Sequence, residues 1–284
     1  MERTLREIAI VVPSLNQGRY LSAALSSLLS QEAVIARVAV VDGGSQDETG
    51  DVLAGFRGGL AWCRMAPDEG QTSAINEGID QLVRLFPAVE YVGWLNADDI
   101  VMSDGLRVLA AALDEHPAWV AVAGRAHLIS DSGEVVSEIA TAPFDPRVFS
   151  HMCTISQPAT LVRRAAWQQV GGLDTTLHMC FDYDLWWRLA RIGPIGYANG
   201  TIVAASRDHV STKTRTRRSE YFAEATRVVR RHTGRVPWHW CISEALEREA
   251  GWRIGARPGF GSSLRAGARA VASYLRWNLF RPAA

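Results

Sequence analysis

Short apolar runs alternate with amphipathic stretches along the first 118 residues. The apolar runs predict strands over residues 8–12, 38–41, 60–64 and 91–95. Apolar residues at helical spacing predict helices through Leu21, Leu25, Leu28 and Leu29, over residues 47–56 and over residues 72–85. Strands separated by helices of this length are typical of βαβ units and a parallel sheet.

The pattern changes beyond residue 118. It predicts strands over residues 119–126, 134–140, 159–162 and 201–206 and a helix over residues 184–191. A turn at Asp131-Ser132-Gly133 joins the first two of these strands, which makes them an antiparallel pair. We therefore expect an α/β fold with a mixed, mainly parallel sheet flanked by helices, followed from about residue 206 by a helical C-terminal extension.

Polar clusters follow directly after three of the predicted strands, and they contain Asp42, Asp68 and Asp98. In open α/β sheets, ligands bind in the crevice outside the carboxyl ends of the strands. We therefore expect these three side chains to converge on one crevice, although they are far apart in the sequence.

The composition is that of an average globular protein, since 48% of the 284 residues are apolar and 21% are charged. This excludes a mainly disordered, coiled-coil or collagen-like chain. Thirty basic and thirty acidic residues give zero net charge, which argues against a nucleic-acid partner. Neither a signal segment nor a run of 18 apolar residues is evident, and the four cysteines are sparse. We therefore expect a cytoplasmic protein with reduced cysteines.

The zero net charge hides two opposed parts, because residues 1–206 contain 14 basic and 24 acidic residues and residues 207–284 contain 16 and 6. Such asymmetry marks a basic tail with its own partner, or else the two parts pack together. Near the end, Leu264, Ala268, Val271, Leu275 and Leu279 form a helical stripe. Arginines accompany it at positions 253, 257, 265, 269, 276 and 281. A helix of this kind lies on an anionic membrane surface or docks on the preceding domain.

Asn96-Ala97-Asp98-Asp99 ends the fourth predicted strand with two adjacent carboxylates. Two adjacent carboxylates repel each other, and a cation beside them offsets the cost of this repulsion. A divalent cation that also binds diphosphate oxygens would fill this place. The alternative is that Asp98, Asp99, Ser103 or Asp104 caps the following helix.

Two other turns combine carboxylates with glycines. Asp42-Gly43-Gly44-Ser45 suits an Asp that holds the polar edge of a base or ribose. Asp68-Glu69-Gly70-Gln71 precedes small residues that would let the backbone approach a ligand closely. The first segment can also be an ordinary Asp-Gly turn with a capping box. The second segment has the same structural alternative.

Taken in order along residues 8–212, these segments resemble the motifs of the family 2 glycosyltransferases, which have the GT-A fold. The matching segments are VVPSLNQGRY, VDGGSQDET, DEGQTSAINEG, LNADD, GGLD with FDYDLWWRL, and RDHVS. The resemblance implies a GT-A-type catalytic domain over residues 1–212, with a nucleotide-binding half over about 1–118 and an acceptor half over about 119–212. Residues 213–284 would be the basic helical extension.

The resemblance also implies the reaction and its residues. A sugar would pass with inversion from a nucleotide-diphosphate donor to a hydroxyl of a saccharide or lipid-linked acceptor, in cell-surface polysaccharide or glycolipid synthesis. Asp42 would hold the base, Asp98 and His209 would bind Mn²⁺ or Mg²⁺, and Asp182 would be the general base. The remaining nucleotide contacts would come from Pro13, Ser14, Asn16, Gly44, Asp68, Gly70, Ala74, Asn76, Asn96 and Ala97.

Candidate contacts to the acceptor are Gln157, Asp184 and Trp186, and candidate contacts to the diphosphate are Lys213 and Arg215. Each has a structural alternative. Gln157 can belong to a plain extended segment before a strand, and tryptophans at this spacing are more often core residues. Lys213 and Arg215 can lie on a solvated helix face.

Two positions depart from the family's pattern. Asn96 stands where the metal motif usually begins with Asp, and Phe181 precedes Asp182 where Glu is common. Asp182 and Asp184 therefore compete as the base. In a helix that starts near Asp182 they lie about 200° apart, so only one can face the site. We favour Asp182, which places Asp184 on the helix surface or at its cap.

Two other functions remain open. A non-catalytic nucleotide-sugar-binding protein with a degenerate site would account for Asn96 and Phe181. A sugar-nucleotide pyrophosphorylase would share the nucleotide-binding plan, but no Gly-rich phosphate loop follows the first predicted strand. The missing GxGxxG at residues 13–20 likewise argues against a dinucleotide-dependent dehydrogenase.

Overall fold

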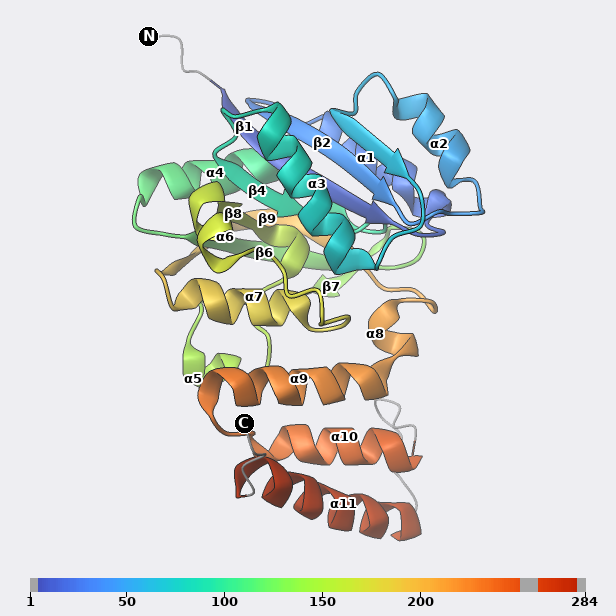
Figure 1. Ribbon diagram of the computed structural model, residues 1–284, viewed down its shortest axis with the longest axis vertical. Coiled ribbons are helices and arrows are strands. Elements are labelled where there is room, and N and C mark those ends of the chain that lie inside the picture. Colours follow the sequence, from blue (N-terminus) through green and yellow to red (C-terminus); the bar gives the residue numbers. More distant parts are fainter. Residues whose placement is uncertain (1–4, 251–259, 280–284) are drawn as a thin grey trace. The chain divides into compact units, whose positions relative to one another are not determined.

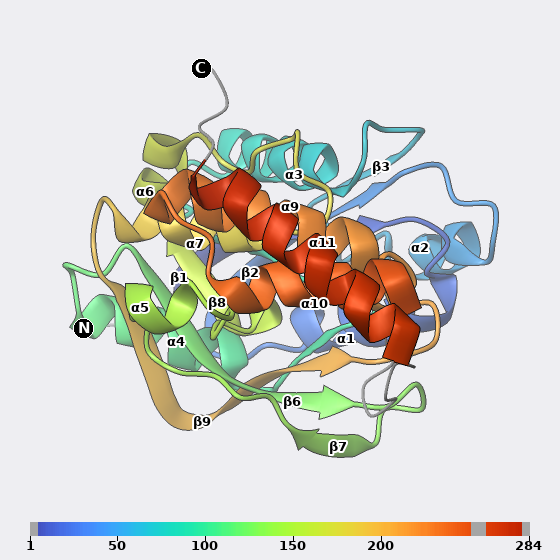
Figure 2. The ribbon, with the colours of Figure 1, turned by 90° about the horizontal axis from the view of Figure 1, so that it is seen from below.

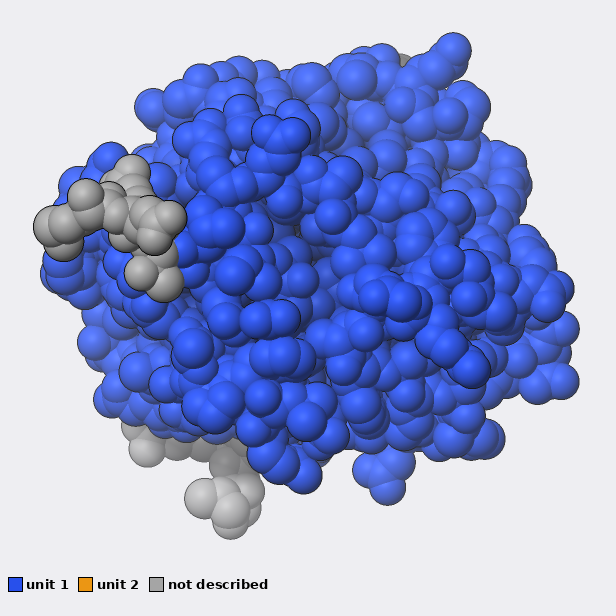
Figure 3. All heavy atoms as spheres, turned by 90° about the horizontal axis from the view of Figure 1, so that it is seen from above, with its two compact units in different colours: residues 1–144, 154–209 blue, residues 145–153, 210–284 orange. Residues whose placement is uncertain are grey.

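The computed structural model describes residues 5–250 and 260–279, so Arg253, Arg257 and Arg281 of the basic segment lie outside the described residues. The chain folds into two compact units. Unit 1 comprises residues 1–144 and 154–209, and unit 2 comprises residues 145–153 and 210–284. Figure 3 shows the surface of unit 1. The second break lies close to the predicted boundary at residue 212, whereas the contribution of residues 145–153 to unit 2 was not predicted.

Unit 1 is built around a mixed β-sheet (Figure 1). Among the described residues the strand order is β3-β2-β1-β4-β8-β6-β9-β5, and β7 pairs with β6 outside this path. The strands are β1 (Arg6–Ser14), β2 (Val34–Asp42), β3 (Trp62–Met65), β4 (Tyr91–Trp94), β5 (Ile100–Val101), β6 (Ala121–Ile129), β7 (Val135–Glu138), β8 (Thr160–Arg163) and β9 (Ile195–Arg207).

The strand directions confirm the predicted mixed, mainly parallel sheet. β1 runs parallel to β2 and β4, β2 runs parallel to β3, and β6 runs parallel to β9. β8 runs antiparallel to β4 and β6, while β5 and β7 run antiparallel to β9 and β6. The carboxyl ends of β1, β2, β3 and β4 therefore share one edge of the sheet, and the polar clusters follow there.

The helices of unit 1 flank this sheet. They are α1 (Gly18–Leu29), α2 (Thr49–Phe56), α3 (Gln71–Leu85), α4 (Gly105–Glu115), the short 3-10 helix η1 (Gln157–Ala159), α6 (Arg164–Val170) and α7 (Phe181–Ala190). The buried residues Ile10 of β1 and Leu25 of α1 belong to one core cluster. At Gly78 of α3, an added Cβ would lie 2.6 Å from Val11 Cγ1, so α3 packs closely against β1.

Several elements differ from the sequence prediction, and three of the differences are informative. β5 was missed, because a strand of two residues shows no period. β9 begins six residues earlier than the predicted start at 201, since its first part pairs with β6. α7 begins at Phe181 rather than Asp184, so both candidate bases lie in its first turn.

Unit 2 is helical in its described residues. Its helices are α5 (Pro146–Phe149), α8 (Lys213–Thr216), α9 (Arg218–Thr233), α10 (Trp238–Ala250) and α11 (Phe260–Asn278). The Trp240 indole donates to the Ser150 carbonyl at 2.9 Å, which ties α10 to the segment just after α5. α10 and α11 pack side by side (Figure 2). Among the described helices, none combines the length and the apolar character needed to cross a membrane.

Candidate active site

Asp42 ends β2 and is fully buried. Its Oδ1 accepts hydrogen bonds from the backbone N–H groups of Gly44 at 3.0 Å and Ser45 at 2.8 Å, and its Oδ2 accepts one from Ser45 Oγ at 2.5 Å. Gly44 has φ +90°, a conformation that glycine adopts at low cost. The Asp-Gly turn that the sequence offered as an alternative is therefore present, and the contact of Asp42 with a base stays a prediction.

Asn16 ties the loop after β1 to the Asp42 turn. Its backbone N–H donates to Ser45 Oγ at 2.7 Å, and its Oδ1 accepts from the Gln46 N–H at 2.9 Å. Pro13 and Ser14, which precede it, are buried, and Ser14 lies opposite Asp42 in the β1–β2 register. The structure thus assembles the first two predicted nucleotide segments into one surface.

The Asp68 turn and the β4 end adjoin this surface. A Cβ added to Gly43 would lie 3.2 Å from Asp68 Oδ2, so the Asp68 carboxylate lies beside the Asp42 turn. Asp68 Oδ1 also accepts from the N–H of Gly70, which has φ +109° and precedes α3. Gln71 Nε2 donates to Asn96 Oδ1 at 2.9 Å and links the start of α3 to the β4 end. The three polar clusters therefore adjoin one another, as their places on the sheet edge predicted.

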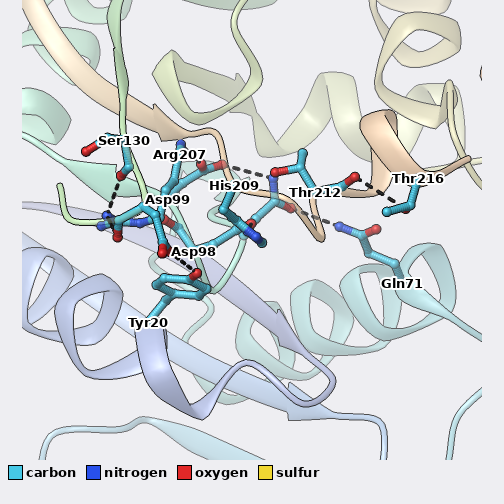
Figure 4. Close-up of polar contacts among 11 residues, drawn as sticks. Tyr20, Gln71, Asp98, Asp99, Ser130, Arg207, His209, Thr212 and Thr216 are labelled. Carbon is cyan, nitrogen blue, oxygen red and sulfur yellow. Dashed lines mark hydrogen bonds and ion pairs between the residues drawn. The ribbon is translucent and has the colours of Figure 1, made fainter. Parts of the chain in front are cut away.

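Asp98, two residues after Asn96, lies beside His209. Asp98 Oδ2 lies 3.0 Å from His209 Nε2, although 111 positions separate the two residues (Figure 4). The His209 side chain is 3% exposed and that of Asp98 is 18% exposed. The Tyr20 ring lies 4.9 Å from the imidazole and covers it. Asp98 is therefore the partly accessible member of a pair whose histidine is held in place.

Asp99 supports this pair from inside the protein. Its Oδ1 accepts from the backbone N–H of Arg207 at 2.9 Å, and its Oδ2 accepts from Asn96 Nδ2 at 3.0 Å. Burial, followed by the negative charge of Asp98, raises the pKa of Asp99 to about 7. Neither Asp98 nor Asp99 caps a helix, because α4 begins later, after Asp104, whose side chain makes no capping bond.

Arg207 was not predicted as a site residue. Its Nε donates to the Asp98 carbonyl at 2.9 Å, and its Nη1 donates to the carbonyls of Ser130 and Asp131, each at 2.9 Å. The carboxylate of Asp131 in turn accepts from the Tyr20 hydroxyl. Arg207 thereby joins the segment of residues 96–99 to the turn between β6 and β7. The only signal in the sequence was its position two residues before His209.

The side chains of Asp98 and His209 offer two donor atoms to a divalent cation. In residues 5–250 and 260–279, no three His, Cys, Asp or Glu side chains gather as a metal cluster. Asp98 and His209 offer one carboxylate and one imidazole. Mg²⁺ in nucleotide sites is held by one or two carboxylates together with substrate phosphates. The pair therefore fits a cation whose remaining ligands would come from a bound diphosphate and water.

Asp182 lies in the first turn of α7 and is partly buried, and its Oδ1 accepts from the Tyr183 N–H at 2.7 Å. The preceding Phe181 ring lies 6.1 Å from Trp94, which ends β4 two residues before Asn96. The first turn of α7 is thus packed beside the strand that leads into the segment of residues 96–99. The role of Asp182 as the base stays a prediction.

Asp184 corrects the expectation of a surface residue. It is fully buried, and its Oδ2 accepts from Arg188 Nε at 2.7 Å. Arg188 also donates to the carbonyls of Val170 at 2.8 Å and Gly172 at 2.6 Å. The i,i+4 ion pair therefore anchors α7 to the end of α6, which is a structural role.

Other residues that were predicted to contact a ligand make contacts within the protein instead. Trp186 is fully buried and stacks on Trp94 at 6.1 Å, so the alternative of a core residue is confirmed. The amide of Asn76 donates to the Leu173 carbonyl and accepts from the Leu173 N–H, each at 2.9 Å, so it joins α3 to the GGLD segment instead of facing a nucleotide. Ala74 and Ala97 have buried side chains.

Gln157 and the two basic residues complete the predicted set. Gln157 is buried in η1, not extended, and its Nε2 donates to the Trp94 carbonyl at 2.7 Å. Its Oε1 lies 3.4 Å from Asn96 Nδ2, so it borders the segment of residues 96–99. Lys213 and Arg215 lie in α8 of unit 2, and their contact with a diphosphate stays a prediction.

Loss of the Asp184 carboxylate should destabilise unit 1. We expect Asp184→Ala to lower the free energy of unfolding by about 3–5 kcal/mol, because it leaves a partly buried Arg188 without its anion. Urea unfolding followed by tryptophan fluorescence measures the change. Asp182→Ala is the matched control, with an expected change below about 1 kcal/mol. Equal stability of the Asp184 variant and the wild type would contradict the structural role.

Asp99 should make the stability of the metal-free protein depend on pH. Its pKa is raised from 3.8 to about 7 in the folded chain, so the folded state holds a proton that the unfolded state releases at lower pH. This contribution is complete below about pH 4 and is lost as the pH rises to about 7. In EDTA, the unfolding free energy of wild type minus that of Asp99→Asn should therefore fall across this window. A flat difference would contradict the raised pKa.

Known proteins share the family and the fold of this chain. A profile for "Glycosyl transferase family 2" matches residues 9–170, more than half of the chain. The chain therefore belongs to this family.

Two curated relatives and two solved structures illustrate the similarity. An uncharacterized glycosyltransferase of Rickettsia prowazekii is 25% identical over 223 residues, covering 74% of this chain and 66% of that protein. A poly-beta-1,6-N-acetyl-D-glucosamine synthase of Staphylococcus epidermidis is 25% identical over 192 residues, covering 64% of this chain and 45% of that protein. The chain thus spans less than two thirds of the length of either.

The solved structures show the same fold at low identity. S. aureus TarS 1-349 in complex with UDP-GlcNAc has a TM-score of 0.67 at 16% identity, covering 96% of this chain and 81% of that one. The mannosyltransferase PcManGT of Pyrobaculum calidifontis, in complex with GDP-Man and Mn²⁺, has a TM-score of 0.58 at 18% identity, covering 96% and 83%. The sheet and its flanking helices therefore form a GT-A-type fold.

Proposed function

We propose that this protein transfers a sugar from a nucleoside-diphosphate donor to an acceptor hydroxyl, with inversion of the anomeric centre. The observation that carries the proposal is the Asp98–His209 pair, held at 3.0 Å just after Asn96, which Gln71 links to the start of α3. Membership of the family supports the reaction class. The nucleotide sugars bound to TarS and PcManGT support a donor of this chemistry.

Asp182 is the general base in this proposal. An acceptor hydroxyl attacks an anomeric carbon poorly because it holds its proton tightly. A carboxylate within hydrogen-bond reach accepts that proton while the new glycosidic bond forms and the bond to the diphosphate breaks. One such base and one direct displacement invert the configuration. Its place on a helix packed beside the end of β4 supports this role.

Asp98 and His209 would hold Mn²⁺ or Mg²⁺, which when bound would offset the charge developing on the leaving diphosphate. Arg207 holds the Asp98 backbone in place through its carbonyl. Lys213 and Arg215 would add charge-assisted contacts to the same diphosphate. The Mn²⁺ complex of PcManGT supports a metal requirement.

The proposed acceptor is a saccharide or a lipid-linked saccharide of cell-envelope synthesis, and the transferred group is a hexosyl or deoxyhexosyl unit. The poly-beta-1,6-N-acetyl-D-glucosamine synthase among the relatives supports polysaccharide synthesis. We place the protein in the cytoplasm, at the inner face of a membrane. The excess of basic residues after position 206 supports this location.

A donor screen tests the proposal. The purified chain is incubated with UDP- and GDP-sugars and Mn²⁺ or Mg²⁺, and released nucleoside diphosphate is measured. Metal-dependent release from one donor supports a transferase. A chain that binds a donor but releases no diphosphate is the non-catalytic binding protein, and release of pyrophosphate from a sugar phosphate and a nucleoside triphosphate identifies a pyrophosphorylase. Either result overturns the proposal.

A further inference from the structure

The apolar stripe of α11 is exposed. We call Leu264, Ala268, Val271, Leu275 and Leu279, which directly follows the helix, the α11 stripe. Leu264 is 60% exposed, Val271 49%, Leu275 37% and Leu279 69%, and Ala268 is also exposed. Large apolar side chains aligned on one exposed helix face point to an interaction surface.

A different face of α11 packs against α10. Ala266 and Ala270 are fully buried and form a small core with Ala245 of α10. Successive residues of an α-helix are about 100° apart, which places these two alanines roughly opposite the α11 stripe. The α11 stripe is therefore not the face that packs on α10, and docking of this helix on the preceding catalytic domain stays a prediction.

Arginines flank the α11 stripe. Arg265, Arg269 and Arg276 lie on one side of it, and the helix itself contains no acidic residue. Arg265 and Arg269 both pair with Glu249, at 3.1 Å and 2.6 Å, so a single carboxylate faces two guanidinium groups. The guanidinium carbon of Arg276 lies 5.7 Å from the Trp277 ring centre. The surface beside the α11 stripe is therefore net positive.

Two aromatic side chains stand on the other flank. Tyr274 of α11 is 37% exposed, and Trp238 of α10 is 44% exposed. Their rings meet edge to face at 5.5 Å. Tyr and Trp combine an apolar body with a polar tip and favour the boundary between acyl chains and headgroups.

We propose that α11 is a membrane-binding helix that lies in the plane of an anionic phospholipid surface. The α11 stripe enters the boundary of the acyl chains, while Arg265, Arg269 and Arg276 contact the phosphate and headgroup oxygens. A second copy of the chain fits less well, because packing stripe on stripe would bring the arginines of two copies close together. The inference rests on the proposed membrane location and names the α11 stripe as the surface that binds the membrane.

Vesicle pelleting of the full chain tests the inference. The protein should pellet with phosphatidylcholine vesicles that contain phosphatidylglycerol, less with pure phosphatidylcholine, and less in high salt. Val271→Glu with Leu275→Glu should weaken binding by about tenfold or more, because two apolar side chains no longer enter the bilayer. Val135→Glu with Val136→Glu on the exposed β7 is the matched control and should pellet as the wild type does.

Circular dichroism and diphosphate release measured without vesicles separate the outcomes. A folded Val271/Leu275 variant that pellets like the wild type overturns the inference. A second result also overturns it. In that result the wild-type chain does not bind anionic vesicles and sediments as a dimer, and the Val271/Leu275 variant sediments as a monomer. Loss of vesicle binding with unchanged diphosphate release supports the membrane role. Vesicle binding without diphosphate release from any donor overturns the proposed function and leaves the inference standing.

Discussion

Replacement of Asp182 by Asn should lower kcat by about 10²–10⁴-fold, which is the usual contribution of a general base. The amide cannot accept the proton of the acceptor hydroxyl, while it keeps the size of the carboxylate. The KM for the donor should stay close to the wild-type value, because the predicted donor contacts lie on other elements. Initial rates at saturating donor and acceptor measure the change.

Asp184→Asn is the matched control, since it changes the competing carboxylate two residues away in the same helix turn. It should lower stability through the Arg188 pair and leave kcat per folded molecule within about threefold of wild type. Near-wild-type turnover by Asp182→Asn, combined with loss of turnover in Asp184→Asn, would reverse the assignment of the base.

Asp98→Ala should lower kcat/KM by at least about 100-fold, because a bound cation contributes several kcal/mol to stabilising the leaving group. EDTA should reduce the wild-type rate to a similar level, and added Mn²⁺ should restore the wild type but not the variant. Titration of Mn²⁺ into both proteins in the presence of the nucleoside diphosphate measures the binding directly.

Asp104→Ala provides the control for Asp98→Ala, because Asp104 is an exposed carboxylate six residues further along that pairs only weakly with Arg107 at the surface. It should leave kcat/KM and the response to EDTA unchanged. If Asp98→Ala kept an EDTA-sensitive rate close to wild type, the metal would have to bind elsewhere.

The parallel half of the sheet could be predicted because its strands carry the strongest local signal. β1, β2 and β4 are buried on both faces, so their sequences contain continuous apolar runs. Polar residues follow at their ends. β5 shows the limit of this reasoning. Ile100–Val101 becomes a strand only because β9 lies beside it.

Asp184 and Asn76 show the same limit for side chains. The spacing of Asp184 and Arg188 was visible in the sequence, but their burial depends on the elements packed over α7. Asn76 lies in a motif that resembles a nucleotide segment, whereas its amide bonds both polar atoms of Leu173, 97 positions away. Local patterns cannot distinguish a polar group aimed at a ligand from one aimed at a distant backbone.

The sequence by itself determined the places of most strands along the chain, the turns that carry Asp42 and Asp68, and the family, because these depend on short-range periods and motifs. The tertiary structure alone decided that Asp98 and His209 lie 3.0 Å apart, that Arg207 joins the segment of residues 96–99 to the β6–β7 turn, and that α11 packs on α10 through alanines and exposes its leucines. These contacts join residues far apart in the chain or select one helix face over another. Their free energy comes from burial and pairing between elements, which no local pattern encodes.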